Sequence, residues 1–296
     1  MAFRRVSIIA ALLASLVPTS IAAQYVRRSC INKDCTAVRA TIHNPPVNLW
    51  DVNVITEFGA FLKELNTTNH TKVVVVSSDV PDFFVTQIDL TILSPGPGSA
   101  PFNATKVLDE YYEGLDLLLA SPVIFIGEVN GRAWGAGDEH LMRMDMRFAG
   151  PDAQFGAPEA AVGLIHVGGL QQLVRLIGPG LAAEYMLSAA QVPAKEAARI
   201  GWVNAAFTTK QALESHVDQL AARIAKFHIE GLRATKASIA EQAPPRSALQ
   251  DDLKRFTDLS ALPFVAKNVA EILVLSNNQS RAWELNNNDN VVAGLY

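Results

Sequence analysis

The sequence predicts an α/β fold with a helical C-terminal region. Four consecutive valines in 72–79 are typical of a strand buried on both faces of a sheet. Apolar residues at helical spacing follow Pro45 and Pro46, in 54–65, and predict an amphipathic helix. Strand and helix patterns then alternate up to Phe207, which indicates an α/β core, and the pattern is almost wholly helical from Thr208.

The individual elements follow from local sequence signals. Apolar strand patterns lie at 122–131, 145–150 and 202–207. Helical patterns lie at 104–121, 137–144, 170–178, 181–189 and 194–201. Pro122 ends the first of these helices, and the Gly178, Pro179 and Gly180 run ends the third. No repeat and no domain-scale linker interrupts the series.

Composition excludes an electrostatic nucleic-acid binder. The 296 residues are 49% hydrophobic and 18% charged, with a formal net charge of −4. The chain can therefore bury a substantial core. It has no run of five or more Lys or Arg residues, so we expect no nucleic-acid partner.

The first 23 residues have the pattern of a secretory signal peptide. Arg4 and Arg5 precede an apolar run at 6–17, and small residues follow Pro18. The run is shorter than the roughly 20 residues that span a bilayer. We expect cleavage after position 22 or 23, against the alternatives of a buried helix or a short anchor.

Two further features are consistent with a secreted protein. Cys30 and Cys35 flank a four-residue polar turn between strand-like segments, where they could form a disulfide across a hairpin. Four Asn-x-Ser/Thr sequons are candidate glycosylation sites: Asn66, Asn69, Asn103 and Asn278. Together these features predict localisation in the secretory pathway or outside the cell.

The stretch 130–140, NGRAWGAGDEH, has small residues between a buried strand and a helix start. Small side chains allow a ligand to approach the backbone, and a helix N-terminus presents unpaired N–H groups. This pattern favours an anion or oxyanion site. Tight strand–helix packing with an ordinary acidic helix start is the alternative.

Read with the residues after it, this stretch resembles the crotonase family of enoyl-CoA hydratases and isomerases. The resemblance extends from about Pro46 to Phe207 and is strongest in PVIFIGEVNGRAWGAGDEHLMRMDMRFAGPDAQFGAPEAAVGL. It implies a spiral of β-β-α units over 24–207. It also implies a helical trimerisation region at 208–296 and a homotrimer or homohexamer.

The resemblance assigns an oxyanion hole to two backbone N–H groups, those of Ala136 and Thr86. Ala136 lies between Gly135 and Gly137, where the family has three glycines, and these two glycines are expected to contact substrate. Thr86 lies in DFFVTQIDL, which matches the family turn only in outline.

Two glutamates of the family's hydratases match Glu139 and Glu159. Two carboxyl groups beside one water can remove one proton and deliver another, as hydration of a conjugated double bond requires. Retention of both favours hydration or dehydration of an acyl thioester or a related carbonyl compound. The alternatives are an enoyl isomerase or a secreted, non-catalytic binding protein. At the level of single residues, Glu139 could be a helix-start carboxylate and Glu159 a surface acid.

A second departure follows Glu159, in the turn GLIHVGGLQQ. This turn is one residue shorter than the family's, with His166 in place of a proline. We expect His166 and Gly168 to line the substrate pocket, with His166 either satisfying the turn or acting as a third acid–base group. Asp138 is not expected to be catalytic. No metal-ligand spacing is present, and acyl-CoA, if used, is a substrate rather than a cofactor.

Overall fold

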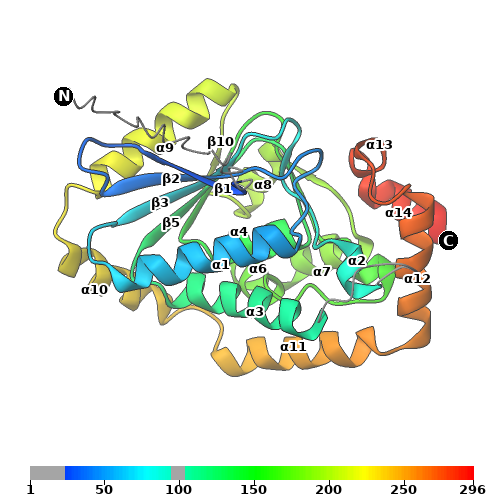
Figure 1. Ribbon diagram of the computed structural model, residues 1–296. Helices are drawn as coiled ribbons and strands as arrows, with labels where there is room; N and C mark the ends of the chain where they lie inside the picture. Colours follow the sequence, from blue (N-terminus) through cyan, green and yellow to red (C-terminus); the bar gives the residue numbers. More distant parts are fainter. Residues whose placement is uncertain (1–23, 95–103) are drawn as a thin grey trace, which may run out of the picture.

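The computed structural model describes residues 24–94 and 104–296, and these residues form two sheets surrounded by helices (Figure 1). The larger sheet has the order β1-β2-β3-β5-β7-β10 and is parallel except for the β1–β2 pair. Its strands are β1 (Val26–Cys30), β2 (Ala37–Ile42), β3 (Val73–Ser78), β5 (Ile124–Val129), β7 (Met146–Ala149) and β10 (Ala205–Ala206). The smaller sheet has the order β4-β6-β8-β9. Its strands are β4 (Phe83–Val85), β6 (Arg132–Trp134), β8 (Gln154–Gly156) and β9 (Val192–Pro193).

Successive strand pairs divide between the two sheets, which gives the predicted spiral. β3, β5 and β7 lie in the larger sheet, and each is followed by a short strand, β4, β6 or β8, in the smaller sheet. Helices come after each pair: α2 (Leu90–Leu93) with α3 (Ala104–Ala120), then α4 (Ala136–Arg143), then α5 (Glu159–Val162). Repeated β-β-α turns of this kind confirm the predicted fold class.

The valine run of β3 separates two layers of the core. Val73 and Val75 pack with α9 (Lys210–Ile224) on one face of the sheet. Val74 and Val76 belong to the main core on the other face, which α1 (Val52–Thr67) covers (Figure 1). Because successive side chains of a strand point to opposite faces, continuous apolar character was the correct sign of burial on both sides.

Helices make up the remainder of the chain. Between β8 and β10 lie α6 (Leu170–Ile177), α7 (Pro179–Ser188) and α8 (Ala194–Ile200). After α9 come α10 (Ile229–Ala240), α11 (Arg246–Ser260), α12 (Pro263–Leu275), α13 (Arg281–Glu284) and α14 (Asn287–Leu295). Within 24–94 and 104–296, no helix combines the length and apolar character that crossing a membrane requires.

The last helices pack against the core of their own chain. Val265, Val269 and Ile272 of α12 form a cluster with Val162 and Leu164, from α5 and the turn after it. α12 and α14 stand together at one end of the molecule (Figure 1). The trimerisation role expected for 208–296 stays a prediction.

The predicted hairpin near the N-terminus is present, and a disulfide joins Cys30 to Cys35 across its turn. Asn66, Asn69 and Asn278 are exposed. The predicted signal peptide, 1–23, and the Asn103 sequon lie outside the described residues.

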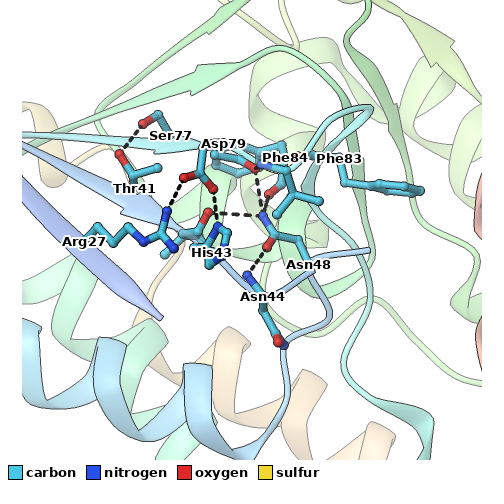
Figure 2. A network of polar contacts seen from close by, with 12 residues as sticks. Arg27, Thr41, His43, Asn44, Asn48, Ser77, Asp79, Phe83 and Phe84 are labelled. Atoms are coloured by element: carbon cyan, nitrogen blue, oxygen red, sulfur yellow. Dashed lines mark hydrogen bonds and ion pairs between the residues drawn. The ribbon is translucent and has the colours of Figure 1, made fainter. Parts of the chain in front are cut away.

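The buried side chain of Asn48 holds β4 against the end of β3. The Asn48 amide donates to Ser78 Oγ at 2.8 Å and to the Phe84 carbonyl at 2.7 Å, and Asn48 Oδ1 accepts from the Asn44 N–H at 2.6 Å. Figure 2 shows these bonds beside an Asp79 carboxylate that contacts Arg27 and His43. Asn48 therefore ties β3, β4 and the loop before α1 together.

Gly137 allows β4 to pass against the first turn of α4. A Cβ atom at Gly137 would lie 2.0 Å from the Val85 carbonyl oxygen, and the Gly137 N–H donates to the Thr86 carbonyl at 3.2 Å. The contact is to backbone, so a side chain could be accommodated only by moving one element away from the other.

We expect Gly137→Ala to lower the free energy of unfolding by about 1–3 kcal/mol, the usual cost of overpacking. Denaturant unfolding of purified protein measures this. Gly59→Ala in α1 is the matched control, since no described atom beyond its chain neighbours and its own helix backbone lies within 4 Å of the added Cβ. It should leave stability equal or raise it by about 0.5–1 kcal/mol. Equal stability of the two variants would contradict this account of the β4–α4 contact.

Candidate active site

An apolar cavity, open in part to solvent, lies between the core and the C-terminal helices. Ala136, Glu139 and Glu159 line it together with Gln87 and Ile88. Its apolar lining includes Leu108, Val162 and Leu164 from the core, and Phe256, Ile272 and Val291 from α11, α12 and α14. Polar groups thus converge on an otherwise apolar pocket, which is the usual composition of a small-molecule site.

Ala136 is the first residue of α4, so its N–H has no acceptor within the helix. Gly135 precedes it with φ of +40°, and a Cβ there would lie 2.6 Å from Glu159 Oε1. Only glycine allows both this backbone conformation and the close approach of that carboxylate. Ala136 therefore lines the cavity beside Glu159, and the oxyanion role expected for its amide stays a prediction.

The N–H of Thr86 is already bonded inside the protein. It donates to the Asn48 carbonyl at 3.1 Å, and the Thr86 side chain donates to the Val47 carbonyl at 3.0 Å. This geometry does not support Thr86 as an oxyanion donor. The next two residues, Gln87 and Ile88, line the cavity, and their N–H groups have no hydrogen-bond acceptor within residues 24–94 and 104–296. The pattern of side chains in the turn could not reveal which backbone amide is free.

Glu139 is buried, with 6% of its surface exposed, although it stands in the first turn of α4. Its Oε1 accepts from the Val167 N–H at 2.8 Å, and its Oε2 accepts from the Tyr111 hydroxyl. Burial, followed by the neighbouring Glu139 carboxylate, raises the pKa of Tyr111 well above its usual value, so the tyrosine remains a donor. Two donors therefore fix the Glu139 carboxylate at the cavity wall. Tyr111 carries no signal of this role in the sequence, because it is one of many apolar positions along α3.

Glu159 is the first residue of α5 and lines the same cavity as Glu139, which belongs to α4. Its side chain is 14% exposed, and its Oε2 has no hydrogen-bond partner among the described residues. A buried carboxylate oxygen without a bonded donor is uncommon in a folded protein. Glu159 is therefore not the surface acid of the alternative interpretation.

His166 lies behind the two glutamates and does not line the cavity. Its Nδ1 is 3.5 Å from Glu139 Oε1 and 3.4 Å from Glu159 Oε2, and its Nε2 is 3.1 Å from Asp138 Oδ2. The other Asp138 oxygen accepts from Trp202 Nε1 at 2.8 Å. His166 thus joins three carboxylates in one buried cluster and lies outside the cavity lining to which the sequence assigned it.

Two glycines allow the short turn to reach this position. A Cβ at Gly168 would lie 2.6 Å from the Glu139 Cβ, and a Cβ at Gly169 would lie 2.5 Å from His166 Nε2. The turn packs so closely on α4 that neither position has room for a side chain. Gly168 therefore supports Glu139 rather than forming part of the cavity lining.

The same cluster could bind a metal ion by geometry. Glu139, Glu159 and His166 each offer one ligand atom, and these atoms lie within 4.8 Å of one another. Two carboxylates and an imidazole are a ligand set that suits several divalent ions. The three residues come from separate segments, so ligand spacing in the sequence could not predict this arrangement.

Another buried carboxylate, that of Glu284, connects the C-terminal helices to a residue of the cavity lining. Glu284 accepts from the Gln87 side chain at 2.8 Å and from the Asn287 side chain at 2.7 Å. Burial raises the pKa of Glu284 to about 7, while the two donated hydrogen bonds oppose this increase. This contact of the Gln87 side chain is a feature that the family motif did not predict.

Comparison with known proteins agrees with this fold. The model of the enoyl-CoA hydratase/isomerase family matches residues 34–262, and the chain belongs to that family. It is 34% identical over 139 residues to 2,3-dehydroadipyl-CoA hydratase of Escherichia coli, covering 46% of this chain and 54% of that protein. It is 36% identical over 140 residues to crotonyl-CoA hydratase of Syntrophomonas wolfei, covering 47% of this chain and 51% of that protein. The chain therefore spans about half the length of each of these relatives.

Structural similarity covers more of the molecule. A crystal structure from Streptomyces avermitilis, assigned as an enoyl-CoA hydratase, superposes with a TM-score of 0.78 at 27% identity. The match includes 92% of this chain and 98% of that one.

The raised pKa of Glu284 predicts a pH-dependent stability. In the unfolded chain this carboxyl ionises near pH 4.5 and in the folded protein near 7. The folded state therefore binds more protons between these values, and the stabilisation from the protonated form declines as pH rises toward 7.

Glu284→Gln, which cannot ionise, should gain stability relative to the parent protein between pH 5 and pH 8, by about 1–3 kcal/mol. Thermal melts at four pH values test this, with exposed Glu271→Gln as control. A difference that does not change with pH would contradict the prediction.

Proposed function

We propose that the protein is an enoyl-CoA hydratase-like enzyme that adds water to, or removes it from, an acyl thioester. The observation that carries this proposal is the position of Glu139 and Glu159 at one end of an apolar cavity, beside the free Ala136 amide. The relatives named as hydratases support the same reaction class.

The mechanism divides acid–base work between two carboxyl groups. One glutamate takes a proton from water as the oxygen adds to the β-carbon, and the other delivers a proton to the α-carbon. Negative charge develops meanwhile on the thioester oxygen, where the Ala136 N–H and a second amide, that of Gln87 or Ile88, stabilise it. The N-terminal end of α4 adds a favourable dipole at this point.

The cavity favours an apolar acyl chain. Its aliphatic and aromatic lining offers few hydrogen-bond partners beyond the residues at the catalytic end. We infer that the variable part of the substrate is hydrocarbon, with the thioester at the glutamates.

Purified protein should hydrate crotonyl-CoA, measured as loss of the conjugated absorbance. Glu139→Gln and Glu159→Gln should each lower kcat by roughly two to four powers of ten, the usual contribution of positioned acid–base groups. Exposed Glu271→Gln should retain full activity.

A large loss from only one of the two catalytic substitutions would favour isomerisation. No turnover in the parent protein, together with retained acyl-CoA binding, would favour a non-catalytic binding protein instead.

We also propose that the protein enters the secretory pathway and assembles as a homotrimer or homohexamer. The N-terminal pattern, the disulfide and the exposed sequons support secretion, and the family resemblance supports assembly.

Expression in a secreting eukaryotic host should give a mature chain that begins near Gln24 and contains no free thiol. Intact-mass spectrometry with and without reduction tests both features, and glycosidase treatment locates modification at the sequons. An intact Met1 with two free thiols would contradict secretion.

A further inference from the structure

The Asp138–His166 pair has no role in the two-glutamate mechanism, although it occupies the centre of the buried cluster. We propose that His166 is a positioning residue that carries a proton between Glu139 and Glu159, and that Asp138 holds it in place. This inference rests on the proposed function, because it concerns how the two glutamates of that same site regain their starting protonation states.

Asp138 determines how the imidazole ring is used. The Asp138 carboxylate is fully buried and accepts from Trp202, so it is fixed in position. His166 Nε2 lies 3.1 Å from Asp138 Oδ2, and a hydrogen on Nε2 completes this contact. His166 Nδ1 is then the nitrogen that faces both glutamates.

Nδ1 stands almost equally far from the two carboxylates. It is 3.5 Å from Glu139 Oε1 and 3.4 Å from Glu159 Oε2, and it completes a hydrogen bond with neither in this structure. Two donors hold Glu139 in place, whereas Glu159 Oε2 has no hydrogen-bond partner among the described residues, so a small movement of Glu159 or of the ring would complete one of the two bonds. The nitrogen can therefore serve each carboxylate in turn.

Charge favours a protonated ring at this position. Burial alone would lower the pKa of His166, but Glu159, Asp138 and Glu139 outweigh it and raise that pKa well above the usual value. Tyr111 contacts Glu139, and the buried Arg147 guanidinium acts on Asp138. The site therefore keeps its mobile proton on the imidazole, between two carboxylates.

The proton transfer through His166 restores both glutamates to their starting states. After one hydration, the glutamate that took a proton from water is neutral, and the glutamate that protonated carbon is ionised. The imidazolium gives its Nδ1 proton to the ionised glutamate, and the neutral imidazole then takes the proton of the other glutamate. One proton has moved from one carboxyl to the other, and the ring is again an imidazolium.

The experiment is ¹⁵N NMR of the histidine rings, from pH 5 to 9, in the purified mature chain. His166→Gln assigns the signal among the six histidines, and exposed His70→Gln serves as control. Both ring nitrogens of His166 should remain protonated at pH 8. In Asp138→Asn and in Glu159→Gln, which keep the ring, loss of the proton should shift to lower pH. A neutral His166 ring at pH 7 in the parent protein would overturn the proposal.

Kinetics tests the transfer itself. His166→Gln should lower kcat for crotonyl-CoA hydration by about 10²-fold with little change in KM. Asp138→Asn should move the basic limb of the kcat–pH profile to lower pH, which a merely structural role would not do. An unchanged kcat and profile in an active His166→Gln protein would overturn the inference alone.

Two other outcomes distinguish proton transfer by His166 from the proposed hydration reaction and from metal binding. If the protein does not hydrate crotonyl-CoA but His166 remains an imidazolium, the proposed function is contradicted and the location of the proton on His166 is supported. Stoichiometric divalent metal in the purified protein, removed by chelator with loss of an Nδ1–metal signal, would overturn the inference, because a ligating nitrogen carries no proton.

Discussion

The contact between β4 and the first turn of α4 is the constraint on which the site depends. Gly137 leaves no atom between the helix backbone and the Val85 carbonyl, so the two elements cannot separate without losing their packing. This contact places the Ala136 amide at the cavity, and it places Glu139 less than one helical turn further on. Asn48 holds the other side of the same junction. The reacting end of the cavity is therefore set by backbone packing, and side chains complete it.

Burial of several ionisable groups at one place is tolerable only because each has a partner. Asp138 accepts from Trp202 and bonds His166, and Glu139 accepts from Tyr111 and the Val167 amide. An unpaired charge would cost several kcal/mol in such surroundings. Glu159 is the member with the fewest bonds, and it also lies closest to solvent. The least constrained carboxylate is thus the one with most freedom to move between partners.

Local sequence signals predicted the elements well and the pairings between them poorly. The valines of β3 predicted a buried strand, and the glycines around Ala136 predicted a close backbone contact, because burial and close approach restrict the residue type at each position directly. Motif resemblance located Glu139 and Glu159. The Asp138–His166 pair joins residues 28 apart in the chain, and no periodicity connects them. Thr86 was misassigned for a related reason, since a backbone bond to Asn48 leaves no trace in the side-chain pattern.

Helices α12 and α14 form one wall of the cavity, so the site cannot be complete until these helices have been synthesised. Gln87 meets Glu284 across 197 residues, and Val291 of α14 lines the same space as Leu108. A ribosome adds about 5–20 residues per second, so many seconds separate synthesis of the two walls. The nascent core must carry an open apolar trough until the C-terminal helices arrive. The two walls therefore cannot enclose a ligand until synthesis has passed Val291.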